Sequence, residues 1–401
     1  MSIWAIVFKS LRQHALSTTV TAISIALAGG LLMAVWSVKE QAQATFTQVD
    51  AGFDAVLGAR SSKLQLVLNA VFHLEASPAN IAMTDYEAIK KHPSVELAVP
   101  IAMGDNYHGY RVVGTTEEMF TKSEYAPGRR FVVQKPGRLF DPKLREAVVG
   151  AYVARRLGLT YGSKFHPHHG LNHDDEHEHD DEYVVVGVLE PSNTPADKVL
   201  WVPLAGVQNM TGHAVETADD VSAVLVKLRS MMAGPALEQE INRKGTRLTF
   251  AWPIGATMAE LFNKIGWFDR VLALIAVLVA VVAAGSVLAS IYNSMNERRR
   301  QIAILRALGA RRSTIASTVV LEAVAIAMIG SVIGYVFYGA ILGTAGAVIR
   351  AQTGVVLDAF AWNAMLLWAP LGLVTLSALA GIVPAWKAYR TDVAENLAPT
   401  D

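Results

Sequence analysis

Four long apolar stretches constrain this chain more than any other feature of its sequence. They lie at residues 18–40, 267–296, 314–349 and 362–385. Each contains the run of about 20 apolar residues that a helix needs to cross the hydrocarbon core of a bilayer. One such stretch could be a core helix of a soluble protein, but four together predict four transmembrane α-helices. The composition agrees, since 52% of the 401 residues are hydrophobic and only 17% are charged.

The basic residues predict how the spans are oriented. Those nearest the spans are Lys9, Arg12, the arginines between 297 and 313, Lys387 and Arg390. The loop at 350–361 carries only Arg350 and Asp358. Lys and Arg are enriched on the cytoplasmic side of a membrane. We therefore expect both termini, segment 297–313 and the tail 386–401 in the cytoplasm, and the large segment 41–266 on the other side.

The N-terminus offers two interpretations. Residues 1–17 have an amphipathic pattern, with Trp4 and Phe8 near Lys9 and Arg12, which predicts a helix in the membrane interface. The basic start, the apolar run and an Ala-Gln-Ala triplet at 42–44 also resemble a cleavable signal peptide. The run is long for a signal peptide, so we expect a retained anchor.

Segment 41–266 has the alternating pattern of a large α/β extracytoplasmic domain inserted between spans 1 and 2. The predicted strands include 94–103, 110–115, 146–150, 183–190, 198–204, 221–228 and 246–252, and the predicted helices include 151–158 and 236–244. Another helix is expected to begin at a Thr84–Glu87 capping box and to stop before Pro93. Gly158 is expected to end the helix over 151–158.

A histidine-rich loop at 166–182 falls between two of these strands, so we expect it at the tip of a hairpin. Its histidines are His166, His168, His169, His173, His177 and His179. Neutral imidazole binds Zn²⁺ well. The surplus of ligands, with flexible Gly170 and Asn172, favours a labile Zn²⁺ site over a fixed structural one. The alternative is a solvated acidic tip with no role in metal binding.

The segment 297–313 between spans 2 and 3 combines apolar and basic side chains on a predicted helix that turns back at a glycine. The candidate contact residues for a partner are Glu297, Arg298, Arg299, Gln301, Ile302, Ile304, Leu305, Arg306, Leu308 and Gly309. Here the chain resembles the FtsX/MacB-like family of ABC transporter permeases, which includes the lipoprotein-releasing permeases. The family pattern is close to ER…EIGILRALGA…I, from which Gln301 and Ala303 depart. The resemblance continues through Glu322 to the closing segment 384–397.

That resemblance implies a non-catalytic permease subunit in the bacterial cytoplasmic (inner) membrane. It would bind a separate ABC ATPase, form a homodimer or pair with a related permease, and pass ATP-driven motion to its periplasmic domain. ATP would act only through the partner subunit, and the sequence has no phosphate-binding G-x-x-x-x-G-K-[ST] loop. Possible further partners are a periplasmic adaptor, a metal-binding protein or a lipoprotein, besides membrane lipid.

Several other functions remain open or are excluded. The complex could handle zinc, release lipoproteins, export small molecules or regulate cell-wall hydrolases. Outside the family, the chain could be a metal sensor without an ATPase. The absence of Cys excludes thiolate chemistry, and the zero net charge gives no sign of nucleic-acid binding. No G-x-S-x-G or H-E-x-x-H motif predicts a hydrolase. Glu322 in span 3 could mark function, but we favour a headgroup-level position or an interhelical hydrogen bond.

Overall fold

The computed structural model describes residues 3–48, 52–170, 180–210, 219–264, 266–297, 303–304, 306–307, 309–353, 356–358 and 361–390. The chain forms two compact units. The helical unit comprises Met1–Gln41, Gly266–Ala347 and Leu357–Asp401, and the α/β unit comprises Ala42–Ile265 and Val348–Val356. We had expected an extracytoplasmic domain at 41–266, and had not expected residues 348–356 to join it.

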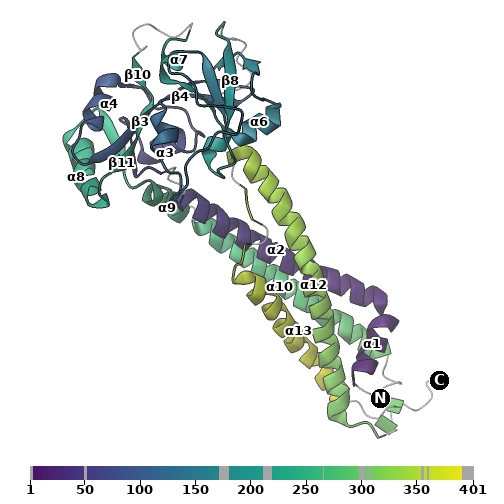
Figure 1. Ribbon diagram of the computed structural model, residues 1–401. Coiled ribbons are helices and arrows are strands. Elements are labelled where there is room, and N and C mark those ends of the chain that lie inside the picture. The colour runs from purple at the N-terminus through teal and green to yellow at the C-terminus, as the bar shows by residue number, and fades with distance from the viewer. Residues whose placement is uncertain are drawn as a thin grey trace. The chain divides into compact units, whose positions relative to one another are not determined.

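The helical unit is built from long apolar helices. They are α1 (Ile3–Gln13), α2 (Ala15–Gln48), α10 (Gly266–Glu297), α12 (Arg312–Thr353) and α13 (Met365–Arg390). Within the described residues, four of them are long and apolar enough to cross a membrane, over Ala15–Ala44, Arg270–Met295, Arg312–Thr353 and Met365–Lys387. α10 and α13 lie side by side (Figure 1). Three helices run several residues beyond the ends of their expected spans, since α2 continues to Gln48, α12 to Thr353 and α13 to Arg390.

Small residues let α2 and α12 approach closely. Ala22, Ala26 and Gly30 follow one another at intervals of four on α2, and Gly330 and Gly334 do so on α12. A Cβ atom at Gly30 would lie 2.8 Å from the carbonyl oxygen of Gly334, and one at Gly330 would lie 2.8 Å from that of Ala22. Such spacing is typical of helix pairs in membranes, where packing rather than hydrophobic burial drives association.

The α/β unit contains a ten-stranded mixed sheet in the order β12-β1-β11-β3-β4-β9-β5-β8-β6, with β7 paired to β3 (Figure 1). These strands are β1 (Ala55–Ala59), β3 (Val95–Tyr107), β4 (Tyr110–Thr115), β5 (Glu146–Val149), β6 (Lys164–Phe165), β7 (His168–His169), β8 (Tyr183–Val188), β9 (Leu200–Pro203), β11 (Ala223–Leu228) and β12 (Leu248–Ala251). β2 (Ile81–Ala82) and β10 (Asp220–Val221) form a separate pair.

Helices cover both faces of the sheet, because alternate strand residues contribute to two apolar cores. One face is covered by α4 (Met83–Lys90), α6 (Ala151–Leu157), α7 (Leu204–Gln208) and α8 (Gly234–Gln239). The other is covered by α3 (Lys63–Ala70), α5 (Glu118–Thr121) and α9 (Ile254–Lys264). Short helical turns complete the unit: η1 (Pro195–Lys198), η3 (Met231–Ala233) and η4 (Glu240–Lys244). Strands buried on both faces explain the unbroken apolar runs in the sequence.

Two local predictions meet different outcomes. The helix over 151–158 is confirmed as α6, and Gly158 ends it with a left-handed backbone (φ 68°). The capping box at Thr84 is wrong, because α4 begins at Met83 and its N-cap Ala82 makes no side-chain hydrogen bond. The physical reason lies upstream: β2 pairs with β10 up to Ala82, and Met83 packs against the core, so the helix starts before Thr84.

Candidate functional site

The joint between α10 and α12 is described in part. Gly309 has the positive φ (95°) expected of a turn, and its N–H donates to the carbonyl of Arg306 (3.0 Å). The side chain of Ile304 is 45% exposed, while Ala303 is buried. Six candidate contact residues lie outside the described residues: Arg298, Arg299, Gln301, Ile302, Leu305 and Leu308. Glu297 is the last residue of α10. Among its described residues, the joint therefore has an exposed apolar side chain and a tight turn.

Cations and aromatic rings tie together the helix ends next to this joint. Lys387 on α13 donates to the hydroxyl of Tyr292 on α10 (2.5 Å), and its ammonium lies 4.1 Å from the ring centre. Arg312 at the start of α12 lies 5.8 Å from the ring of Tyr389 on α13. Such cation–π contacts attract the cation to the electron-rich face of the ring and so hold the helix ends together. The basic residues predicted to be cytoplasmic thus also connect three helices to one another.

Glu322 makes an interhelical hydrogen bond. Its carboxylate is buried on α12 and accepts a hydrogen bond from the hydroxyl of Ser10 on α1. Val7 and Ser10 are the buried residues of α1, whereas Trp4 and Phe8 are exposed. This geometry matches one of the two interpretations that we favoured for Glu322. It fixes the N-terminal helix to α12 through the face of α1 that also buries Val7.

The C-terminal end of α12 is anchored within the α/β unit. Lys198 extends its ammonium to the carbonyl oxygens of Ala351 (2.8 Å) and Gln352 (2.7 Å). The last carbonyls of a helix have no partner in the helix and carry partial negative charge, so a lysine there caps them. Burial lowers the pKa of Lys198 from its ordinary value. The hydrogen bonds to carbonyl oxygens offset part of the cost of burying this cation.

Two further contacts complete what we call the α12 anchor, formed by Tyr152, Asn193 and Lys198 with Arg350, Ala351, Gln352 and Val356. The side chain of Asn193 accepts a hydrogen bond from the backbone N–H of Val356 (2.6 Å) and donates to its carbonyl (3.5 Å). The guanidinium of Arg350 lies 5.6 Å from the ring centre of Tyr152. Sequence reasoning missed this site because no local motif marks residues that lie between 153 and 198 positions apart.

A buried carboxylate shapes the loop that carries Asn193 and Lys198. Asp197 accepts hydrogen bonds from the backbone N–H groups of Ser192 (3.0 Å) and Asn193 (3.0 Å), and from the Ser192 hydroxyl (2.8 Å). Burial raises the pKa of Asp197, while these donors act in the opposite direction. The loop is thereby held in one shape, with Asn193 at a positive φ of 57°.

The histidines of the loop 166–182 do not all lie together. His173, His177 and His179 lie outside the described residues. β6 pairs with β8 in antiparallel fashion, which confirms the hairpin, but His168 and His169 form the additional strand β7 on β3. His169 Nδ1 lies 3.6 Å from the buried carboxylate of Asp105, and His166 lies 3.8 Å from Glu182. His168 stacks on Tyr107, with 6.4 Å between ring centres. Among the described residues no group of three or more His, Asp and Glu is placed to hold a metal ion.

Another histidine has a structural role. His73 meets the indole of Trp201 edge-on at 5.6 Å between ring centres, and its carbonyl accepts from Arg111 (3.5 Å). Burial, helped by the charge of Arg111, lowers the pKa of His73 to about 3. His73 is therefore neutral at physiological pH and acts as an aromatic packing residue against Trp201.

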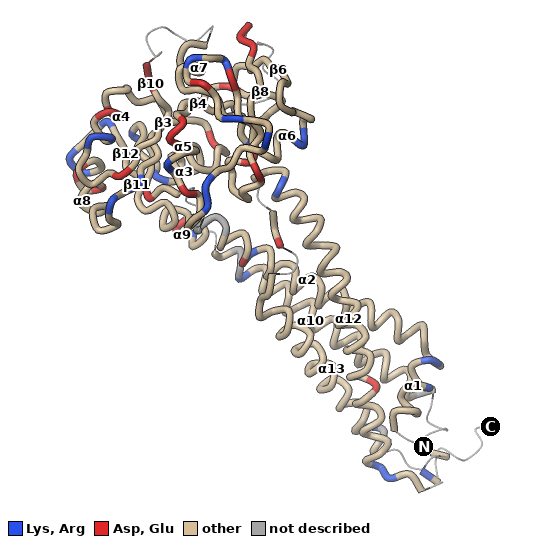
Figure 2. The backbone as a smooth tube through the Cα atoms, in the orientation of Figure 1, with Lys and Arg blue, Asp and Glu red and all other residues tan. Residues whose placement is uncertain are grey.

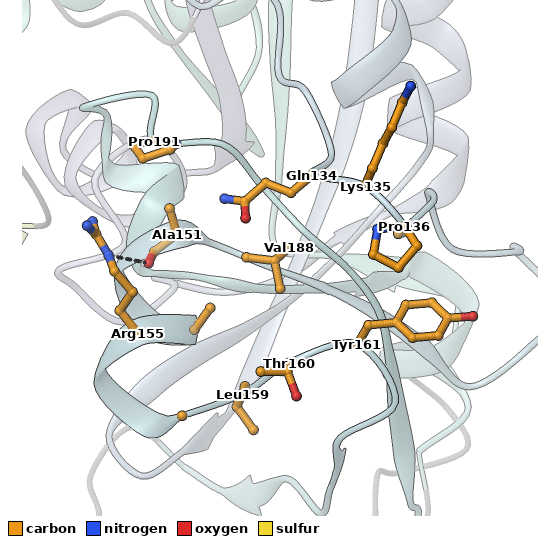
Figure 3. Close-up of a pocket in the computed structure, with 13 residues that line it drawn as sticks. Gln134, Lys135, Pro136, Ala151, Arg155, Leu159, Thr160, Tyr161, Val188 and Pro191 are labelled. Carbon is orange, nitrogen blue, oxygen red and sulfur yellow. Dashed lines mark hydrogen bonds between the residues drawn. The ribbon is translucent and has the colours of Figure 1, made fainter.

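A pocket of about 470 Å³ opens on the α/β unit beside α6 (Figure 3). Its lining comes from residues 134–137, from Ala151, Ala154 and Arg155 of α6, from residues 158–161, and from Val188 and Pro191. In Figure 3, Arg155 and Tyr161 stand on opposite sides, with Gln134 and Val188 between them.

Comparisons with known proteins cover most of the chain. Residues 15–244 match the family model of the MacB-like periplasmic core domain, and residues 273–393 match that of the FtsX-like permease C-terminal region. The macrolide export ATP-binding/permease protein MacB of Nitrobacter winogradskyi is 25% identical over 227 residues, which is 54% of this chain and 34% of that protein. A probable export ATP-binding/permease protein MacB of Pseudomonas entomophila is 30% identical over 190 residues, 44% of this chain and 27% of that protein. The chain thus spans about a third of the length of these relatives.

Solved structures resemble the chain only loosely. The extracellular domain of the noncanonic ABC-type transporter YknZ from Gram-positive bacteria has 18% identity and a TM-score of 0.31, covering 49% of this chain and 99% of that one. The periplasmic region of MacB from Actinobacillus actinomycetemcomitans has 12% identity and a TM-score of 0.35, covering 53% and 94%.

Four apolar helices with an α/β domain inserted after the first define a multi-spanning permease of the inner membrane. The chain belongs to the FtsX/MacB-like family of ABC transporter permeases. The relatives named above are ATP-binding/permease proteins, and the part of this chain at residues 273–393 matches the permease model.

Proposed function

We propose that the chain passes ATPase-driven motion through the membrane to its α/β domain. The observation that carries this proposal is α12, which runs unbroken from Arg312, just after the turn at Gly309, to Thr353 within the α/β unit. At 1.5 Å per residue its 42 residues extend about 63 Å, roughly twice the hydrocarbon thickness of a bilayer. A displacement at one end of this helix therefore reaches the α12 anchor at the other.

The partner in this proposal is an ABC ATPase subunit that binds at the joint between α10 and α12. The exposed Ile304 would enter an apolar site on the ATPase, beside the basic residues of the joint. We expect the permease to act as a homodimer or with a related permease, with both termini cytoplasmic. A periplasmic adaptor, a metal-binding protein or a lipoprotein would meet the α/β domain.

The first test is co-purification of the tagged full chain from membranes of its own organism, followed by measurement of ATP hydrolysis. Wild type and the conservative Ile304→Leu variant are expected to retain an ABC ATPase. Ile304→Asp, which places a charge at the contact, is expected to retain at least about fivefold less. Recovery of no ATPase by wild type, or equal recovery by all three, contradicts the proposal.

The second test asks whether the α12 anchor transmits the motion. Hydrogen exchange over 191–203 is measured in the complex with and without ATP and vanadate. The wild-type complex is expected to show a nucleotide-dependent difference, which Lys198→Met removes while ATP hydrolysis continues. Lys143→Met, an exposed lysine elsewhere in the same domain, serves as the matched control. A nucleotide response that survives in Lys198→Met assigns transmission to other contacts.

A metal role is the second part of the proposal. His169 turns Nδ1 toward Asp105, which is the arrangement that orients a histidine to bind metal through its other nitrogen. Because adjacent strand residues face opposite sides, His168 would belong to a different ligand group. We propose that His166, His168, His169, His173, His177 and His179 together provide labile Zn²⁺ sites. Calorimetric Zn²⁺ titration of the full chain should lose its signal when residues 171–179 are deleted, and equal binding by both forms rejects the site.

Export of a small molecule is the principal alternative to metal handling. The names of the relatives, macrolide export and syringafactin export proteins, favour it. Transport assays with the reconstituted complex distinguish the two, since a metal role predicts a dependence on Zn²⁺ that an export role does not.

A further inference from the structure

The charged side chains that line the pocket beside α6 are all of one sign. Its two charged lining residues, Lys135 and Arg155, are both cationic, and no carboxylate lines it. Asp197, whose charge acts on Arg155, is buried and turns its oxygens to Ser192 and Asn193 instead. A ligand in this pocket therefore meets positive charge that the lining residues do not compensate.

The exposed guanidinium of Arg155, at the edge of the pocket, is held by one hydrogen bond within its helix. Its Nε donates to the carbonyl oxygen of Ala151 one helical turn earlier (3.2 Å), as drawn in Figure 3. This bond uses the inner nitrogen and leaves the two terminal nitrogens for a ligand. Two parallel N–H groups of a guanidinium match the two oxygens of a carboxylate. Gln134 is fixed too, since its amide nitrogen donates to the carbonyl of Leu189 (2.9 Å).

The rest of the lining is largely apolar. Leu159, Ala151 and Ala154 are buried, and Pro136, Val188 and Pro191 add further carbon surface. A volume near 470 Å³ lies in the usual range for sites that take small organic ligands, where a few polar groups orient an apolar body. We propose that this pocket binds a small amphipathic carboxylate, with its acid group on Arg155 and its apolar part against α6 and Val188.

The pocket shares two elements with the α12 anchor. Helix α6 turns Ala151, Ala154 and Arg155 to the pocket, while its Tyr152 meets Arg350 of α12. Pro191 lines the pocket, and Asn193 two residues later bonds Val356. A ligand that orders α6 and the loop at 191–198 thus orders the end of α12. The biological role of this coupling rests on the proposed function. The coupling itself can be measured without an ATPase.

The test uses the full chain in nanodiscs, with empty nanodiscs subtracted. Two carboxylates represent two sources of the same chemistry: octanoate for a free fatty acid, and N-acetyl-leucyl-leucine for a peptide C-terminus. Calorimetry or ligand-observed NMR is expected to show binding of at least one acid and none of the matching amide. Which acid binds more tightly identifies the source.

Variants assign the binding to the pocket. Arg155→Gln is expected to weaken the acid about tenfold, as loss of a charge-assisted pair would. Arg155→Lys keeps the charge without the two parallel donors. Its affinity for the acid should lie between those of wild type and Arg155→Gln. Arg129→Gln, an exposed arginine outside the pocket, is the matched control and should bind like wild type. The proposal is overturned if neither acid binds at millimolar concentration, if amides bind as well as acids, or if Arg155→Gln binds like wild type.

Hydrogen exchange separates this result from the proposed function. When the acid is bound, the backbone amide hydrogens of residues 151–157 and 348–353 should exchange more slowly in wild type. In Arg155→Gln, their exchange rates should not change. Binding without this protection rejects the coupling to α12. A chain that binds the acid but recovers no ATPase supports the pocket while rejecting the proposed function.

Discussion

At the scale of single residues, Arg138 and Glu146 form an ion pair joined by two hydrogen bonds in the α/β unit. The two guanidinium nitrogens of Arg138 meet the two carboxylate oxygens of Glu146 at 2.6 and 2.5 Å. One of these oxygens also accepts from the backbone N–H of Asp141 (2.9 Å). Glu146 is buried at the start of β5, whereas Arg138 is half-exposed. The pair fastens the loop before β5 to the sheet.

This pair predicts a pH-dependent stability. The hydrogen bonds from Arg138 lower the pKa of Glu146 below its ordinary value near 4.5. A lowered carboxylate pKa stabilises the fold above the ordinary value, and this contribution is lost as the pH falls through the lowered pKa. Glu146→Gln should reduce the unfolding free energy at pH 7 by about 1 kcal/mol, since water screens the exposed Arg138. The difference from wild type should shrink below pH 4, as followed by urea unfolding with tryptophan fluorescence.

The control is Glu260→Gln. Glu260 pairs with Lys264 (2.8 Å) at an exposed helical position, so its loss should leave the urea midpoint unchanged at every pH. A Glu146→Gln effect that stays constant down to pH 3 would assign the loss to packing rather than to the ion pair.

Residue-level sites were the least predictable from sequence. Ile304 and Gly309 could be singled out because the joint follows a local pattern, and Gly309 adopts the predicted turn. Lys198 could not, because its role depends on carbonyl oxygens more than 150 residues away that only the fold brings near. The pocket could not be predicted from sequence either, because its lining residues come from four separate stretches of the chain.

At the scale of elements, the contact of α2 with α12 depends on the absence of side chains. A Cβ at Gly30 would lie 2.7 Å from the Cβ of Phe337 and 2.8 Å from the Gly334 carbonyl oxygen. Backbone atoms cannot move aside as the end of a flexible side chain can. The two helices would have to separate to admit a methyl group.

Gly30→Ala is therefore expected to destabilise the helical unit by about 1–3 kcal/mol, the usual cost of overpacking. Gly339→Ala on α12 is the matched control, because a Cβ there meets no atom within 4 Å. The control should be neutral, or stabilising by up to about 1 kcal/mol through helix propensity. Thermal unfolding in nanodiscs measures both, and equal midpoints for the two variants would argue against the close approach.

Most elements with a long apolar pattern were predicted, although the fully buried strand β1 (Ala55–Ala59) was missed. The run at 183–188 became β8, and 221–228 contains β11, because strands buried on both faces show unbroken apolar sequence. The two-residue strands β2 and β7 were missed, since two residues carry no periodicity. The error at Thr84 has the same origin: β2, which fixed the start of α4, was not foreseen.

At the scale of the whole molecule, the distribution of charge is the strongest topological signal. Figure 2 shows Lys, Arg, Asp and Glu concentrated in the α/β unit and near the helix ends, with the long helices otherwise nearly free of them. The basic residues at one side of the spans predict a cytoplasmic location for both termini and for the joint.

Because the sequence has no Cys, this orientation can be tested by labelling single introduced cysteines, with no native cysteine in the chain to react. Ala79→Cys in the α/β unit and Ser313→Cys at the start of α12 both place an exposed thiol. In cells with a permeabilised outer membrane, a membrane-impermeant maleimide is expected to label Ala79→Cys fully and Ser313→Cys only after lysis. The reverse pattern would invert the topology while leaving the fold unchanged.

The two sides of the histidine loop have a practical consequence. Before it, the Gly170 N–H donates to the carbonyl of Gly104 (3.1 Å), and after it, Asp181 pairs with Arg145. Both ends are thus fastened to the sheet independently of the residues between them. The interval from 171 to 179 is therefore a natural insertion point for an epitope or a fluorescent reporter, which would let the protein be tracked in living cells with its sheet intact.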